Sequence, residues 1–252
     1  MFTNNPFAAA AQLVSAAFMH WFLIVMVLAV IAGTLFDIAH KGSAKYFFAN
    51  WSKSRAKGSR RIGGGELASI AVQTALVDVM TSGEFCNQRR RLAHLLTMYG
   101  FVIYVVTTAI MVFGDAAPGI VPLAWWIGGL MVLAGGYWFW FFIRADVAAE
   151  GKSPFRVMRA DLFILSLLAS VTLGLVWAAA GGGTGVLFEL YLLTTAVLFG
   201  SVAWSKFAHM FFKPAAAFEK RVSNANDSRM NLPAPADKPE QFGTRVKHVR
   251  HY

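Results

Sequence analysis

Few ionisable side chains lie inside the long apolar segments of this chain, and those few are the first candidates for chemistry. They are His20, His94, Glu189, Lys206 and His209. A titratable group in lipid is costly, so such residues usually handle ligands, protons or ions. Imidazole nitrogen is also a frequent ligand of transition metals and of haem iron. The histidines therefore direct attention to metal or haem chemistry within a membrane.

Two of these histidines stand at matching places next to clusters of cations. His94 comes three residues after a run of three arginines, and His209 comes four residues before a lysine. If both lie in continuous helices, both imidazoles are about one turn, roughly 5 Å, inside the same membrane face. Such a pair suits a b-type haem, whose iron takes two axial nitrogens, and Arg90, Arg91 and Lys206 would suit its propionates. Each histidine alone is explained as well by a hydrogen bond to a neighbouring helix.

Composition indicates which elements must position these residues. Hydrophobic residues make up 57% of the 252 and charged residues 14%, against about 25% charged in soluble proteins. Five apolar runs reach the length of about 20 residues that a bilayer requires. They cover residues 16–38, 92–113, 120–143, 162–180 and 186–212. The predicted fold class is all-α, an integral membrane bundle of five transmembrane helices.

The remaining segments divide into a loop and a tail. Within the loop 41–91, residues 66–80 show the periodicity of an amphipathic helix, with Leu67, Ile70, Ala71, Thr74 and Val77 on its apolar stripe. That helix would lie on the membrane surface or cover the membrane domain as a lid. Residues 1–213 form the predicted membrane domain. Residues 214–252, rich in proline and basic side chains, form the predicted flexible tail on the cytoplasmic side.

The basic residues predict the orientation, because cytoplasmic loops hold an excess of Lys and Arg near helix ends. The loop 41–91 holds ten, the loop 144–159 four and the segment from Lys206 onward nine, which accounts for all 23. The N-terminus is therefore expected outside and the C-terminus in the cytoplasm. The same distribution explains the net charge of +10 by topology, so no nucleic-acid partner is expected.

Several residues of the apolar runs leave two interpretations open. Tryptophans fall near both ends of the predicted spans, where they would form interfacial belts or pack helices together. Those near outer ends are Trp21, Trp125, Trp126 and Trp177, and those near inner ends are Trp138, Trp140 and Trp204. Gly100 falls in the middle of a run, where it would allow a close helix approach or make room for a macrocycle. His20 lies at the opposite side from His94, where it could line a quinone or proton site, although a packed or interface histidine is the expected role.

Two His-centred runs resemble the cytochrome b membrane subunits of quinone-interacting oxidoreductases. They are residues 89–108 (RRRLAHLLTMYGFVIYVVTT) and 204–214 (WSKFAHMFFKP). That group includes nitrate reductase gamma, heterodisulfide-reductase-type and Qmo-type membrane subunits. In overall size and loop pattern the chain looks most like the membrane anchor of adenylylsulfate reductase from sulfur-oxidising bacteria.

The resemblance implies a role in electron transfer. His94 and His209 would be the axial ligands of one haem b on the cytoplasmic side. The chain would link a cytoplasmic iron–sulfur flavoprotein, similar to adenylylsulfate reductase in sulfite oxidation, to membrane quinone as substrate. It would be a multi-pass subunit of the bacterial inner membrane, without catalysis of its own. Two-haem members of that group carry a second histidine at the outer end of the last span, where this chain reads Glu189, Leu190 and Tyr191, and some of them place another ligand where it has Tyr104.

Quinone reduction consumes protons, so a titratable group near the haem is expected. Asp161, His40 and Lys206 are candidates by position only, and Arg90, Arg91 and Lys206 could also contact the quinone. The alternatives are a haem-free passive anchor for a soluble partner and a membrane subunit of another quinone-linked oxidoreductase. A small transporter would be expected to show repeated halves, which five unmatched spans do not provide.

Overall fold

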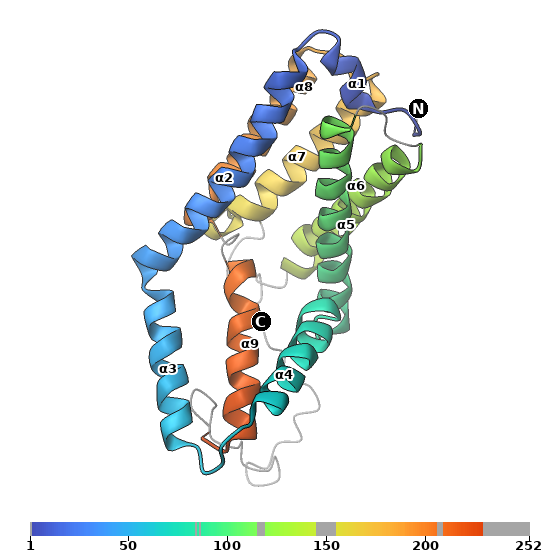
Figure 1. Cartoon of the computed structure of the whole chain (residues 1–252). Helices are drawn as coiled ribbons and strands as arrows, with labels where there is room; N and C mark the ends of the chain where they lie inside the picture. The colour runs from blue at the N-terminus through green and yellow to red at the C-terminus, as the bar shows by residue number, and fades with distance from the viewer. Residues whose placement is uncertain are drawn as a thin grey trace. The chain divides into compact units, whose positions relative to one another are not determined.

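The computed structural model describes residues 2–83, 85, 87–114, 119–144, 155–205 and 209–228. In that part of the chain every regular element is a helix (Figure 1), which confirms the all-α prediction. The chain divides into two compact units. Unit 1 comprises Met1–Phe36 and Arg89–Ala208, and unit 2 comprises Asp37–Gln88 and His209–Tyr252. The boundary falls inside one long helix, and each unit is described by itself.

Unit 1 holds the long apolar helices. They are α1 (Pro6–Ala11), α2 (Ala16–Lys41, as far as Phe36), α5 (Gln88–Phe113), α6 (Ile120–Trp138), α7 (Leu162–Ala179) and α8 (Val186–Gly200). A π-helical turn, η2 (Phe139–Ile143), continues α6. Four of the resulting helices are long and apolar enough to cross a bilayer, namely Ala16–His40, Gln88–Phe113, Ile120–Ile143 and Leu162–Ala179. These four agree with the first four predicted spans and indicate a multi-pass membrane protein.

The fifth predicted span differs from the structure, because residues 186–212 do not form one helix. Helix α8 ends at Gly200, a short 3₁₀ turn, η5 (Val202–Trp204), follows, and Ser205 is extended. Glycine is a poor helix former and stands next to a serine here, which favours a helix end. Fifteen residues rise about 22 Å, less than the roughly 30 Å of a bilayer core. The predicted continuity of this span was wrong.

Paired glycines let α6 approach both of its neighbours. A Cβ placed at Gly128 would lie 2.9 Å from the carbonyl oxygen of Gly100 on α5, and one at Gly135 would lie 2.5 Å from that of Ala93. The adjacent glycines of the two pairs face α7 instead, against leucine side chains. The two pairs are seven residues apart, so they recur on the same faces after two turns. Gly100 therefore serves close helix approach, which decides between its two interpretations.

Unit 2 is built from shorter and more polar helices. They are α3 (Ser43–Lys57), α4 (Gly64–Gln73), a π-helical segment η1 (Thr74–Met80) that continues α4, and α9 (His209–Ala225). Helix α9 contacts α3, α4 and η1 (Figure 1). The predicted amphipathic helix over 66–80 is confirmed. Ile70 and Thr74 are buried and Leu67 is half-buried, whereas Val77 is exposed. Ala71 is exposed as well, so α9, which contacts α4 and η1, covers only part of the predicted stripe within unit 2.

Helix α9 also changes the local structure expected after residue 213. The chain stays helical through Pro214 to Ala225, and its apolar face is buried at Ala217 and Val222. Proline lies here in the second turn of the helix, where it removes one backbone donor. Packing against the amphipathic helix outweighs that loss. Residues 229–252, the greater part of the predicted tail, lie outside the described residues.

Candidate functional site

The two predicted haem ligands lie in different units. His94 belongs to the second turn of α5 in unit 1, and its side chain is exposed. Arg90 and Arg91 precede it in the first turn and are half-buried. His209 is the first residue of α9 in unit 2, and its side chain lies outside the description, as does the whole of Lys206. The structure describes one predicted ligand and two of the three predicted propionate partners.

The sequence argument that put both histidines at one depth assumed a continuous fifth helix. Because α8 ends at Gly200 and His209 begins a separate helix, counting residues from one helix end to the other no longer fixes that depth. The geometric part of the haem prediction therefore loses its premise. What the structure offers is an exposed imidazole beside two arginines at the start of α5, a donor set that fits one side of a haem.

His20 has the packing role expected of it. Its Nε2 donates to the carbonyl oxygen of Val112 at 2.9 Å, so α2 and α5 are joined by an interhelical hydrogen bond. The ring also stacks on Phe113, with ring centroids 4.9 Å apart. Both contacts orient the imidazole within unit 1. This histidine makes the kind of hydrogen bond that the sequence left open for His94.

Asp161, a predicted proton or quinone candidate, is held in a buried ion pair. Its Oδ2 accepts from Nη2 of Arg144 at 2.5 Å and from the backbone N–H of Met158 at 2.8 Å. The same guanidinium donates to the carbonyl oxygen of Arg156 and lies over the ring of Trp140. Both charged side chains are nearly buried. The arrangement joins the end of α6 to the start of α7, a structural task that position alone did not reveal.

The other proton candidate, His40, lies near the end of α2 in unit 2 and is exposed. No group of three or more His, Cys, Asp or Glu side chains with metal-binding geometry occurs among the described residues. A haem with two axial ligands needs no such cluster. The donor set that remains relevant is therefore the pair of histidines, of which only His94 has a described side chain.

The core of unit 1 near α1 is filled by a cluster of aromatic side chains. Tyr104 stacks on Trp125, and Tyr191 stacks on Trp177, with centroids 4.9 Å and 5.6 Å apart. The two tyrosine hydroxyls lie 3.4 Å apart, and Phe7 of α1 packs against both tryptophans. Both tyrosines are buried, so their own rings fill this part of the interior.

Gly174 of α7 makes this arrangement possible, because a Cβ there would collide with both Tyr104 and Tyr191. Trp125 is fully buried, and its Nε1 donates to the hydroxyl of Thr108 at 2.8 Å. Trp177 is likewise buried, and its Nε1 donates to the carbonyl oxygen of Gly183. For these tryptophans packing, not an interfacial belt, is the right interpretation.

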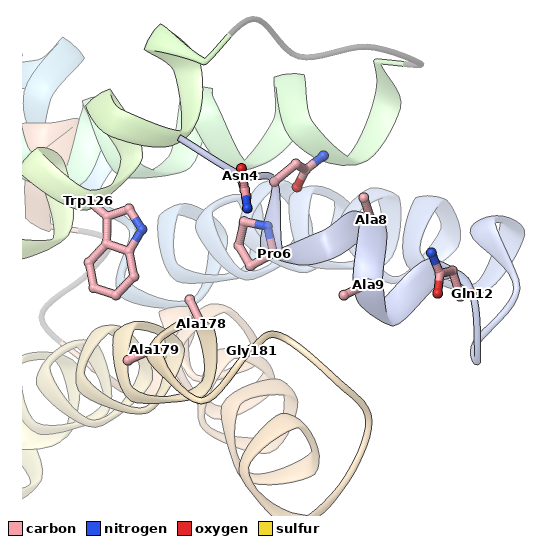
Figure 2. A pocket seen from close by; sticks show the side chains of 10 residues that line it. Asn4, Pro6, Ala8, Ala9, Gln12, Trp126, Ala178, Ala179 and Gly181 are labelled. Atoms are coloured by element: carbon pink, nitrogen blue, oxygen red, sulfur yellow. The ribbon is translucent and has the colours of Figure 1, made fainter. Parts of the chain in front are cut away.

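A cavity of about 430 Å³ opens beside this cluster in unit 1. Figure 2 shows the indole of Trp126 on one side, Ala178 and Ala179 below, and Asn4 with the α1 residues on the other side. None of the side chains that line it is titratable. The lining amide of Asn5 is already engaged, since it caps α1 and donates to the carbonyl oxygen of Met111 at 2.9 Å. None of the predicted site residues lines the cavity.

Unit 2 contains a second ion pair that the sequence did not suggest. Arg221 of α9 donates from Nε and Nη2 to the two carboxylate oxygens of Asp78, at 2.5 Å and 2.9 Å. The residues are 143 positions apart, so no spacing pattern could have paired them. A possible signal was Asp78, one of the two acidic residues of the helix 66–80, because a carboxylate on a largely apolar helix needs a cationic partner.

Comparison with known proteins adds no relative. No protein-family model matches the chain, and no curated protein or solved structure matches it significantly.

Proposed function

We propose that this chain is the membrane anchor and electron-transfer subunit of a quinone-linked oxidoreductase complex, in which His94 and His209 hold one haem b. A cytoplasmic iron–sulfur flavoprotein, similar to adenylylsulfate reductase, would deliver electrons, and membrane quinone would accept them. When bound, the haem supplies one-electron transfer. The observation that carries the proposal is the exposed imidazole of His94, one turn after Arg90 and Arg91 in a membrane-length helix.

The chain's own residues would perform the remaining tasks. Arg90 and Arg91 would neutralise carboxylates at the cytoplasmic boundary, since guanidinium groups pair well with them. His20 joins α2 to α5, and the glycines of α6 draw α5 and α6 together, so the helix that carries His94 has two fixed neighbours. Asp161 maintains the α6–α7 connection through Arg144. A proton path through His40 or Lys206 remains part of the proposal on position alone.

Five passages through the bacterial inner membrane, with the N-terminus outside, belong to the same proposal. The four long helices and the one-sided distribution of Lys and Arg support it. Single cysteines at Ser15 and Ser52, introduced with Cys86 replaced by serine, test it with a membrane-impermeant maleimide on intact spheroplasts. Labelling of the first and protection of the second are expected. The reverse pattern would refute the orientation.

The haem assignment is tested by a reduced-minus-oxidised spectrum and haem quantitation on the full chain purified from membranes. We expect a b-type spectrum in the unaltered chain and loss of haem in His94→Ala and in His209→Ala. The matched control is His20→Gln, whose amide N–H can still donate to Val112, and it should retain its haem. Full haem content in both alanine variants would reject the ligand assignment.

A haem-free anchor is the second candidate, and the folded structure of unit 2 favours it. The Asp78–Arg221 ion pair and the burial of Ile70 make unit 2 a defined helical unit that could dock a soluble partner by itself. This candidate predicts no Soret band in any preparation. It also predicts that replacing His94 leaves quinone-linked activity of the assembled complex intact.

A further inference from the structure

Unit 2 contains a small cavity with an unusual concentration of arginine. Its volume is about 320 Å³, and it lies where α3, the α3–α4 connection, α4 and α9 meet. Guanidinium groups and apolar side chains alternate in its lining, which includes Trp51, Arg55, Arg60, Arg61, Leu67 and Val222. None of the lining residues is acidic. The cavity therefore combines three positive charges with an apolar wall.

A rigid polar frame stands behind this cavity. Asn226, which also lines it, donates to the carbonyl oxygen and the hydroxyl of Ser54, both at 3.1 Å. The hydroxyl of Ser54 in turn lies 3.1 Å from that of Ser223, and both serines are fully buried. Trp51 stacks on Phe218 of α9, with centroids 5.6 Å apart. These contacts fix α3 against α9, so the base of the cavity is preformed.

The three arginines differ in whether a carboxylate already forms an ion pair with them. Nη2 of Arg60 lies 2.5 Å from a carboxylate oxygen of Glu66. For Arg55 and Arg61, both exposed, the described residues offer no ion-pair partner. Two uncompensated guanidinium groups at the edge of one cavity favour an anion that accepts several hydrogen bonds at once, and phosphate oxygens match their planar fork.

We propose that this cavity binds a phosphate-bearing ligand, held by Arg55 and Arg61 and contacted on its less polar side by Trp51 and Leu67. The headgroup of an anionic phospholipid and a soluble phosphate compound share this chemistry. A volume of about 320 Å³ accommodates either phosphate group with its first substituent. Glu66 acts as an internal competitor, because it occupies the third guanidinium while no ligand is bound.

The test uses the full chain in a neutral detergent, with affinities measured by isothermal titration calorimetry. The probes are inorganic pyrophosphate, dioctanoyl phosphatidate and, as the zwitterionic lipid, dioctanoyl phosphatidylcholine. The variant Arg55→Gln/Arg61→Gln removes the two free guanidinium groups. Its matched control, Lys53→Gln/Lys57→Gln, removes the same charge from exposed positions of α3 that do not line the cavity.

We expect the arginine variant to lower the affinity for the bound probe at least tenfold, and the lysine variant to change it less than twofold. Glu66→Gln, which frees Arg60, should raise the affinity. Tighter binding of phosphatidate than of pyrophosphate would identify a lipid headgroup, and the opposite order a soluble phosphate compound. Either order supports the proposal if the arginine variant loses the binding. Equal losses in the two double variants, or no binding of either anionic probe by the unaltered chain, would overturn it.

Discussion

Replacing Gly100 with alanine should separate α5 from α6 and destabilise unit 1. A Cβ at this position would lie 2.6 Å from the carbonyl oxygen of Gly128 and 2.8 Å from the backbone nitrogen of Val132. Both of those atoms belong to the backbone of α6, so no side-chain rotation can relieve the overlap. The helices themselves must move apart.

The magnitude follows from how far these distances fall short of normal contact. Carbon and oxygen atoms in close helix contacts are about 3.3–3.6 Å apart, so the shortfall at Gly100 is roughly 0.7–1 Å. Overpacking of this kind typically costs about 1–3 kcal/mol. Alanine recovers up to about 1 kcal/mol in helix propensity. Subtracting the full propensity gain leaves an expected net loss of about 0–2 kcal/mol for Gly100→Ala in the free energy of unfolding, and a difference of about 1–3 kcal/mol from a variant that has the propensity gain alone.

Gly200→Ala is the matched control, since it makes the same chemical change in an apolar helix. Among the described residues, no atom outside the chain neighbours and the backbone of α8 lies within 4 Å of a Cβ placed there, so only the propensity gain of up to about 1 kcal/mol applies. Unfolding in mixed micelles with increasing dodecyl sulfate, followed by far-UV circular dichroism, measures both variants. Equal transition midpoints for the two would refute the close α5–α6 contact.

Three further substitutions test individual contacts by the same unfolding measurement. Asp161→Asn removes the carboxylate that pairs with the nearly buried Arg144 and should cost about 3 kcal/mol, whereas a purely catalytic Asp161 would leave stability unchanged. Asp78→Asn weakens the bidentate pair with the partly exposed Arg221 and should cost about 1–2 kcal/mol, with faster amide exchange confined to α4, η1 and α9. Trp125→Phe keeps the stacking but loses a buried hydrogen bond to a threonine hydroxyl, which should cost about 1–2 kcal/mol; an unchanged midpoint would contradict that bond.

The elements that could be predicted from the sequence are those that local composition determines. Long apolar runs gave four helices within a few residues of their ends, and the 3.6-residue period gave the amphipathic helix 66–80. The prediction of one continuous helix over residues 186–212 was wrong because hydropathy is averaged over a window. Such an average does not show that the low helix propensity of Gly200 and Ser201 ends the helix there. Helix α9 was not predicted because Pro214 and the polar residues after it indicated a flexible tail. The helix is stabilised by packing on the helix 66–80, which is distant in the sequence.

For the candidate site, the residue types in the sequence indicated which side chains matter, but the sequence did not indicate which side chains contact each other. His20 was correctly expected to be a packed histidine, because no second histidine stood at its depth. Asp161 was taken as a proton or quinone candidate by its position, yet it pairs with Arg144, which lies 17 residues earlier in the sequence. The direct contact between Tyr104 and Tyr191 depends on the absence of a side chain at Gly174. These residues come from three different helices, so the sequence periodicity of any one helix cannot predict the contact.

The end of α8 links the topology to the haem proposal. Helix α8 provides about 22 Å of rise, so a fifth passage requires residues beyond Gly200 to contribute the remaining 8 Å or so. If η5 and the residues after it complete that passage, His209 lies at the cytoplasmic boundary, where α5 begins with Arg90 and Arg91. If α8 instead returns without crossing, His209 and the basic residues after it are separated from that boundary and cannot share a haem with His94. Two results together would therefore support a complete fifth passage: loss of haem in His209→Ala, and protection of the C-terminal side from impermeant labelling. Neither result alone is sufficient.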